Sequence, residues 1–209
     1  MNKQLKKIVE DRDIKWLFHF TRAENIPNIF SYGLLSVENL EALSIDFYYN
    51  DSYRYDKCRN AVCTSIQFPN YKMFYPLRLN NPGVEWVVLK LDASILYELD
   101  CAFCITNAGS GEVYNIPITE RMGAEAFNKL FDDYPSYPLR QQLGISDRCP
   151  TNPQAEVLVF NTIPINYIKS VYFKDSHTLH KFEEYIPENI NATVNSKVFI
   201  YRSDYEYWR

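Results

Sequence analysis

Runs of apolar residues separated by polar clusters predict a strand-rich chain. Stretches rich in β-branched and aromatic residues predict strands, at residues 15–21, 61–66, 84–91, 155–160 and 168–173, with a C-terminal pair at 192–194 and 197–201. Capping and stop signals predict helices, at residues 24–30, 37–43, 93–99, 120–131 and 176–185. Strands and helices do not alternate regularly, which favours a mixed α+β fold over a doubly wound one.

The chain has 209 residues, enough for one sizeable core, and we expect a single domain over residues 1–209. Residues 36–60 are polar, with clustered Asn and Asp, and predict a long loop around one short helix. Residues 107–154 carry Gly, Pro and Asn at many positions around one helix. We interpret them as an insertion or loop region rather than a second core.

Composition and charge narrow the classes of function. Hydrophobic residues make up 46% of the chain and aromatic residues 16%, which is typical of a globular protein. The net charge of -4 argues against a long duplex-binding surface, because such surfaces are usually basic. A local groove that stacks a few nucleotides of a single strand remains compatible with it. The sequence shows no transmembrane run or signal peptide, so we expect a cytoplasmic protein whose five cysteines are reduced.

Glu156 is the residue that most needs a chemical explanation. It is the one carboxylate in the apolar stretch 155–160, both faces of which look buried. A buried carboxylate loses hydration unless it is paired, hydrogen-bonded or facing a ligand cavity. Glu156 is therefore either a catalytic group or a strand-edge residue paired with a surface lysine.

Three further features are candidates for a binding site. His19 and Thr21 lie two apart on a strand and so share one face, where they either hold a sugar or amide group or serve a structural role. Arg54 and Arg59 lie in the polar loop, as anion ligands or as solvated ion pairs. The aromatic segment 71–75 either packs in the core or forms a stacking wall for a nicotinamide or nucleobase ring.

Several other sites are disfavoured by missing motifs. Cys101 and Cys104 form a single C-x-x-C without the second pair that a structural zinc site needs. His177 and His180 lack the pattern of a zinc protease helix. The chain has neither a phosphate-binding P-loop nor the glycine fingerprint of a Rossmann site. We therefore expect no metal, and no kinase, NTPase or dehydrogenase activity.

A series of motifs runs in order along the chain. Residues 19–29, HFTRAENIPNI, fit the pattern H-x-T-x-x-[DE]-N-[IL] and lead to Gly33 and two leucines. The loop that holds Arg54 leads to residues 65–75, and residues 153–159 read PQAEVLV. This order of a His strand, an Arg loop and a Glu strand, with an aromatic ending at 201–208, resembles the DarT family of DNA ADP-ribosyltransferase toxins.

The resemblance implies an ADP-ribosyltransferase fold of two apposed mixed sheets with flanking helices and an NAD cleft. It implies that NAD is a substrate and that ADP-ribose passes to a base of single-stranded DNA. Glu156 would be the catalytic carboxylate, and Arg54 would pair with the NAD phosphates or orient the base. The resemblance assigns NAD contacts to the following residues: His19, Thr21, Asn28, Gly33, Leu34, Arg54 and Tyr71.

The resemblance also implies a cellular role and a partner. The chain would be the toxin of a toxin-antitoxin or phage-defence system, and an antitoxin hydrolase of macrodomain or NADAR type would be its partner. Residues 68–73, FPNYKM, look closer to the guanine-modifying branch than to the thymine-specific one. Arg54 is preferred over Arg59 as the active-site arginine from its place before the strand at 61–66.

Two other functions stay open at this point. An ADP-ribosyltransferase that acts on RNA or protein would share Glu156 and the NAD site, and the acidic net charge favours it. A catalytically silent module that binds NAD or nucleic acid would instead use Glu156 for structure.

Overall fold

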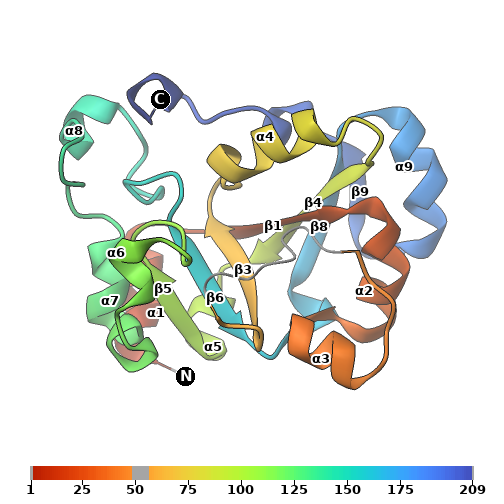
Figure 1. The fold of residues 1–209 in the computed structure, drawn as a ribbon, viewed down its shortest axis with the longest axis horizontal. Coiled ribbons are helices and arrows are strands. Elements are labelled where there is room, and N and C mark those ends of the chain that lie inside the picture. The colour runs from red at the N-terminus through yellow and green to blue at the C-terminus, as the bar shows by residue number, and fades with distance from the viewer. Residues whose placement is uncertain (1, 49–56, 209) are drawn as a thin grey trace.

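A computed structural model describes residues 2–48 and 57–208 of the chain (Figure 1). Its strands are β1 (Trp16–Arg22), β2 (Leu34–Leu35), β3 (Ala61–Ile66), β4 (Trp86–Asp92), β5 (Cys101–Cys104), β6 (Glu156–Phe160), β7 (Thr162–Ile163), β8 (Ile168–Phe173) and β9 (Asn191–Val194). Its helices are α1 (Lys3–Asp11), α2 (Ile26–Tyr32), α3 (Val37–Ala42), α4 (Tyr71–Asn80), α5 (Ile95–Glu98), α6 (Gly111–Tyr114), α7 (Gly123–Lys129), α8 (Arg140–Leu143) and α9 (Ser176–Phe182).

Within these described residues, the main sheet has seven strands in the order β5-β6-β3-β1-β4-β8-β9, and β2 pairs with β7 separately. Neighbouring strands are antiparallel except β8 and β9, which run parallel. β1 pairs with β4 along its whole length, whereas its pairing with β3 joins Leu17 to Ile66 and Phe18 to Ser65. The sheet turns sharply at this short junction, where β1 and β3 cross steeply (Figure 1). The α+β class is thus confirmed. The two apposed sheets that the resemblance implied are two halves of one continuous sheet.

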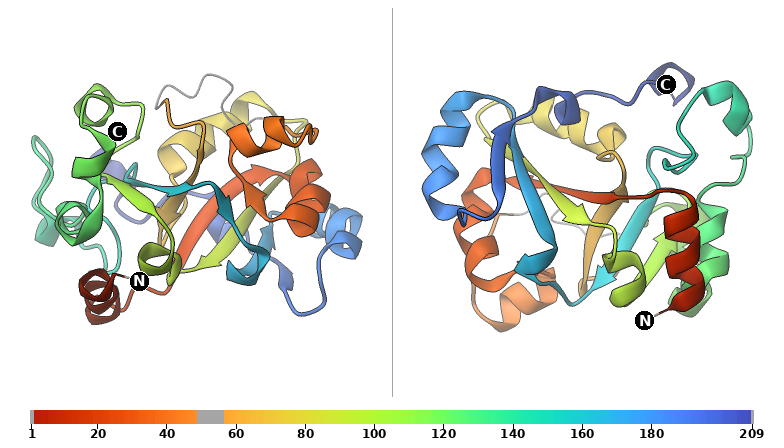
Figure 2. Two further views of the ribbon diagram at one scale, coloured as in Figure 1. Left: turned by 90° about the horizontal axis from the view of Figure 1, so that it is seen from below. Right: turned by 180° about the vertical axis from the view of Figure 1, so that it is seen from behind.

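Helices cover the sheet on several sides (Figure 2). At one end, α1 packs against α5 and α7, and α7 contacts β5. At the other end, α9 packs against β8 and β9. Among the described residues, no helix combines the length and the apolar character that crossing a bilayer requires.

The two faces of β1 are buried in different ways. Leu17 belongs to the main core, whereas Phe18 belongs to a smaller aromatic cluster with Phe74 and Trp86. Phe20 stacks on Phe74 with ring centroids 4.4 Å apart. Because side chains alternate along a strand, this aromatic anchor turns the intervening polar residues of β1 toward the opposite face. Burial of each such ring stabilises the fold by roughly 1.5–3 kcal/mol.

Most strands and helices predicted from the sequence are present, and the strands at 61–66 and 168–173 match to the residue. The helix predicted at 120–131 is α7, which places Phe127 in the main core, so the segment 107–154 contributes to that core. Helix α4 was not predicted, because its aromatic start and internal Pro76 are poor helix signals.

The predicted C-terminal strand pair is wrong in its second member. β9 is present, but it pairs in parallel with β8, and residues Ser196–Phe199 form a 3₁₀ turn instead of a strand. The Asn195 side chain accepts a hydrogen bond from the backbone N–H of Lys197 at 3.2 Å and so starts the turn. The turn buries Val198 and Phe199 in the aromatic cluster, a tertiary gain that outweighs their strand propensity.

Candidate active site

A cavity of about 230 Å³ lies at the junction of the two sheet halves, where β1, β3 and the start of β6 meet helix α2. Six of the residues predicted for the site line it: His19, Thr21, Asn28, Gly33, Leu34 and Glu156. Five of them lie within residues 19–34 and Glu156 lies far along the chain, so the fold brings the opening motif and the glutamate strand together.

Glu156 is held in a fixed orientation at this cavity. Glu156 is buried, with a relative exposure of 6%. One carboxylate oxygen, Oε2, accepts a hydrogen bond from the backbone N–H of Ala108 at 2.9 Å. The other, Oε1, accepts from the amide of Asn107 at 3.0 Å and from the amide of Asn70 at 3.3 Å. These three donors replace much of the hydration that a buried carboxylate loses.

The backbone around Glu156 is also fixed. β6 lies between β3 and β5, and Glu156 at its start is the register partner of Cys104 on β5. Arg121 donates to the Cys104 sulfur at 3.4 Å. Burial raises the pKa of the Cys104 thiol to about 12, although the nearby Arg121 charge opposes the shift. The Cys104 thiol, beside Glu156 on the neighbouring strand, is therefore neutral near pH 7 and adds no negative charge to the site.

His19 and Thr21 project from β1 into the same cavity, as their spacing predicted. The His19 ring nitrogen Nδ1 lies 2.8 Å from the carbonyl oxygen of Cys63 on β3. Thr21 is buried, and its hydroxyl accepts a hydrogen bond from the Asn25 amide at 2.9 Å. Asn25 also donates to the Tyr48 carbonyl at 3.0 Å and accepts from the Tyr48 N–H at 2.9 Å. This one amide therefore ties β1 to the segment that borders the cavity.

The segment after helix α2 closes another side of the cavity. Asn28 donates to the carbonyl of Asp46 at 2.7 Å. Gly33 ends α2 with a φ of +87°, and a Cβ atom there would lie 3.0 Å from the carbonyl oxygen of Ile163. A glycine is needed on both counts, because other residues disfavour that φ and would clash with the backbone. Leu34 then pairs with Ile163, which fixes this wall to the strand that follows β6.

The chain matches a known protein family along most of its length. A family model described as ssDNA thymidine ADP-ribosyltransferase, DarT, matches residues 18–206. The chain belongs to the DarT family. No curated protein matches it.

Solved DarT structures share the fold. Thermosipho africanus DarTG in complex with ADP-ribose is 20% identical, with a TM-score of 0.62 over 88% of this chain and 51% of that one. Thermus sp. 2.9 DarT in complex with carba-NAD+ is 14% identical, with a TM-score of 0.59 over 89% of this chain and 97% of that one. Thermus sp. 2.9 DarT in complex with ADP-ribosylated ssDNA is 14% identical, with a TM-score of 0.58 over 90% of this chain and 97% of that one. This DarT-family chain spans about half the length of the Thermosipho chain.

The remaining predicted site residues lie elsewhere. Arg54, assigned to catalysis and to NAD, falls outside the described residues. Arg59, the alternative arginine, forms an ion pair with Glu41. Tyr71 is buried at the start of α4, but the described lining of the cavity contains Asn70 and Met73 in its place. Burial raises the pKa of Tyr71, and the nearby Asp204 carboxylate adds to this shift.

Asn70 and Asn107, the two residues whose amides contact Glu156, were not predicted from the sequence. Asn70 also caps α4, because its Oδ1 accepts from the backbone N–H of Met73 at 3.2 Å. Asn107 follows β5 and accepts from the N–H of Gly109 at 3.0 Å. Asparagine next to a strand end or a helix start is a common local signal, and it does not indicate a shared partner. Their position beside Glu156 becomes evident only in the folded chain.

Metal ligands do not cluster in the parts of the chain that the structure describes. Cys101 and Cys104 are both buried in β5, and the Cys101 thiol lies 3.6 Å from the Ile95 carbonyl oxygen. His180 pairs with Glu183 at the surface of α9.

Proposed function

We propose that this chain transfers ADP-ribose from NAD to a nucleobase of single-stranded DNA. The observation that carries the proposal is the orientation of Glu156, whose carboxylate is held at a cavity by Ala108, Asn107 and Asn70. The DarT family model and the structures described with NAD+ and ADP-ribosylated ssDNA support the same chemistry. NAD is a substrate here, and the proposal requires no metal.

The reaction breaks the N-glycosidic bond between nicotinamide and C1 of the ribose. The bonding electrons leave with nicotinamide, and positive charge develops on the ribose. Glu156 would stabilise this charge from beside the 2-hydroxyl, and a carboxylate already fixed by hydrogen bonds needs little reorganisation to do so. A ring nitrogen of the base then bonds to C1 and releases its proton, which the same carboxylate would accept.

The other residues would position NAD. A volume of about 230 Å³ lies below the roughly 300–1,000 Å³ of typical ligand pockets, so we assign the cavity to the nicotinamide-ribose end of NAD. His19 and Thr21 would hold the ribose or the carboxamide, and Asn28, Gly33 and Leu34 would form the adjoining wall. Arg54 would pair with the phosphates or orient the base, since a planar guanidinium suits both tasks.

The first experiment incubates the protein with NAD and short DNA oligonucleotides, which are then weighed by mass spectrometry. We expect a mass gain of one ADP-ribose, and a Glu156→Gln variant should lower its rate by about 10²–10³-fold, as losses of such preorganised groups do. Glu125→Gln is the matched control, because Glu125 is an exposed carboxylate on α7. Oligonucleotides that lack thymine or guanine identify the base, since the family description names thymidine whereas residues 68–73 favour guanine.

Other outcomes would contradict the proposal. Consumption of NAD without modified DNA would favour RNA or protein as the acceptor. Absence of NAD consumption in wild-type protein would favour a binding module and remove the enzymatic role of Glu156.

The toxin role and its partner are part of the proposal. The Thermosipho relative is described as DarTG and is longer than this chain, which supports a functional link to an antitoxin. We propose a macrodomain or NADAR-type hydrolase that removes the modification in the cytoplasm. Growth arrest on expression, relieved by co-expression of such a hydrolase, tests this role.

A further inference from the structure

A second cavity, of about 280 Å³, lies on the other side of Asn107. Asn107 lines both cavities and donates to Glu156 from the wall between them. Among the described residues, the lining of the second cavity includes the aromatic side chains of Tyr134, Tyr137 and Trp208, the charged groups of Lys72 and Glu112, and several amides and hydroxyls. A molecule in this cavity would therefore lie next to the carboxylate, outside the space assigned to NAD.

Three aromatic rings form one wall of this cavity. The rings of Tyr137 and Trp208 are stacked, with centroids 4.3 Å apart and planes 20° apart. The ring of Tyr134 lies 5.9 Å from Trp208 and 5.6 Å from Tyr137. Trp208 is buried, whereas Tyr137 is 39% exposed and still presents ring surface to solvent. An exposed aromatic surface beside a polar cavity suits a flat ring that stacks.

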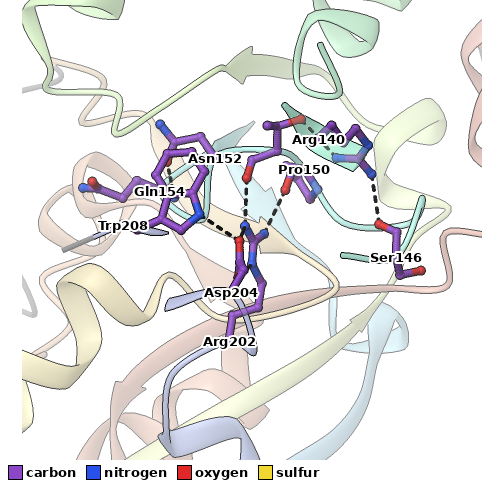
Figure 3. Close-up of polar contacts among 9 residues, drawn as sticks. Arg140, Ser146, Pro150, Asn152, Gln154, Arg202, Asp204 and Trp208 are labelled. Carbon is purple, nitrogen blue, oxygen red and sulfur yellow. Dashed lines mark hydrogen bonds and ion pairs between the residues drawn. The ribbon is translucent and has the colours of Figure 1, made fainter. Parts of the chain in front are cut away.

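A buried network holds this wall in place (Figure 3). Arg202 pairs with Asp204 through two hydrogen bonds of 2.7 Å, and Trp208 donates to the same carboxylate at 2.8 Å. Arg202 also donates to the carbonyls of Pro150 and Thr151, both at 2.8 Å. The C-terminal turn, which contains Trp208, is thereby tied to the loop that precedes β6.

The polar groups of the cavity suit a nucleobase better than a highly charged ligand. Lys72 supplies one positive charge and donates to the carbonyl of Trp208. Glu112 supplies one negative charge and accepts from the Tyr134 hydroxyl at 2.5 Å. The remaining polar groups are amides and hydroxyls that can donate to or accept from the edge of a base. Because the two charges oppose each other, stacking and edge contacts would dominate over phosphate neutralisation.

We propose that the second cavity binds the base of the nucleotide next to the modified one on the acceptor strand. This inference rests on the proposed function, because it needs a DNA strand that reaches Glu156. The strand would present its acceptor base at the Glu156 carboxylate, on one side of Asn107, and stack a neighbouring base on Tyr137, on the other side. The aromatic wall would thereby place the acceptor base and give the enzyme a preference for local sequence.

The test measures the affinity for a fluorescent oligonucleotide that carries a single acceptor base, by anisotropy over a titration of protein that extends to saturation. We expect Tyr137→Ala to weaken binding roughly tenfold, since stacking on one aromatic side chain contributes about 1–3 kcal/mol per base. Tyr137→Phe retains the ring and should bind near the wild-type level. Tyr185→Ala is the matched control, because Tyr185 is similarly exposed but lies after α9 at the far end of the sheet.

An abasic scan identifies the stacked base. Each base near the acceptor is removed in turn, one per oligonucleotide. The resulting loss of affinity is compared between wild type and Tyr137→Ala. One abasic position should weaken binding to wild type and have little further effect in the variant, because the two changes remove the same contact. Additive losses at every position, or equal binding by the Tyr137 and Tyr185 variants, would overturn the inference. If wild type adds no mass to any oligonucleotide, the proposed function itself has failed.

Discussion

The two cavities that meet at Asn107 are built in different ways. The first takes two of its polar side chains from strands of the main sheet, Glu156 from β6 and His19 from β1. The second takes its walls from loops, helix ends and the C-terminal turn, which the Arg202 network holds together. Backbone hydrogen bonds on both sides fix a strand, whereas a loop wall depends on a few side-chain contacts. The fold therefore positions Glu156, the proposed catalytic group, rigidly, and leaves the second cavity, the proposed acceptor side, easier to vary.

The largest effect should follow from breaking the buried pair that supports the acceptor side. Arg202 and Asp204 are 7% and 2% exposed, so Arg202→Met leaves a buried carboxylate that has lost its charged partner. Such a loss costs about 3–5 kcal/mol, which a urea denaturation curve would register. Oligonucleotide affinity should fall while NAD affinity is retained, because the network contacts the second cavity.

Two further variants show whether the loss of stability comes from burial of the unpaired charge or from loss of an ion pair as such. Arg148 forms an ion pair with Asp13 at the surface, and Arg148→Ala should cost less than about 1 kcal/mol. The double variant Arg202→Met, Asp204→Leu should be more stable than the single one, since it leaves no unpaired charge. Equal losses of NAD and oligonucleotide affinity in Arg202→Met would show that the two sides are not separately supported.

The same contrast explains how much the sequence could predict. The strands and the outlying carboxylate of Glu156 are visible in the sequence, because apolar periodicity is local and a charge within it stands out. The first cavity follows from these strands and from the opening motif that contains His19 and Gly33. Helix α4 was missed because Pro76 and its aromatic residues mask a helix that Asn70 starts and tertiary packing stabilises.

The acceptor side was not predictable in this way. Its walls come from segments around residues 72, 106–112, 134–137, 152–154 and 208, and no local pattern relates them. Arg202 and Asp204 are two residues apart, yet their significance lies in the carbonyls of Pro150 and Thr151, about fifty positions away. The aromatic ending is visible in the sequence, but the residues that its rings contact are not.

An intermediate effect should follow from changing the residue that both sides share. Asn107→Ala removes one hydrogen bond to the Glu156 carboxylate and part of the wall of the second cavity. Hydrogen bonds to charged groups contribute about 1.5–3 kcal/mol, so we expect kcat to fall by roughly tenfold or more. Oligonucleotide affinity should fall as well, whereas Tyr137→Ala should change affinity more than kcat. Asn115→Ala is the control, because Asn115 lies at the surface beyond α6; a kcat as low in that variant would rule out a specific role for Asn107.

The smallest expected effect is a difference in cysteine labelling rates, which reports how mobile the two sides are. Cys104 lies beside Glu156 on the neighbouring strand β5, and Cys149 lies in the loop near the Arg202 network. Burial raises the pKa of both thiols, to about 12 for Cys104, so both are neutral at pH 8 and their labelling rates should rise with pH as thiolate forms. With iodoacetamide and peptide mass spectrometry, we expect Cys149 to react several times faster than Cys104, because loops open more often than central strands. Bound oligonucleotide should slow the labelling of Cys149 and leave that of Cys104 unchanged, and equal rates at the two positions would contradict a rigid NAD side beside an adjustable acceptor side.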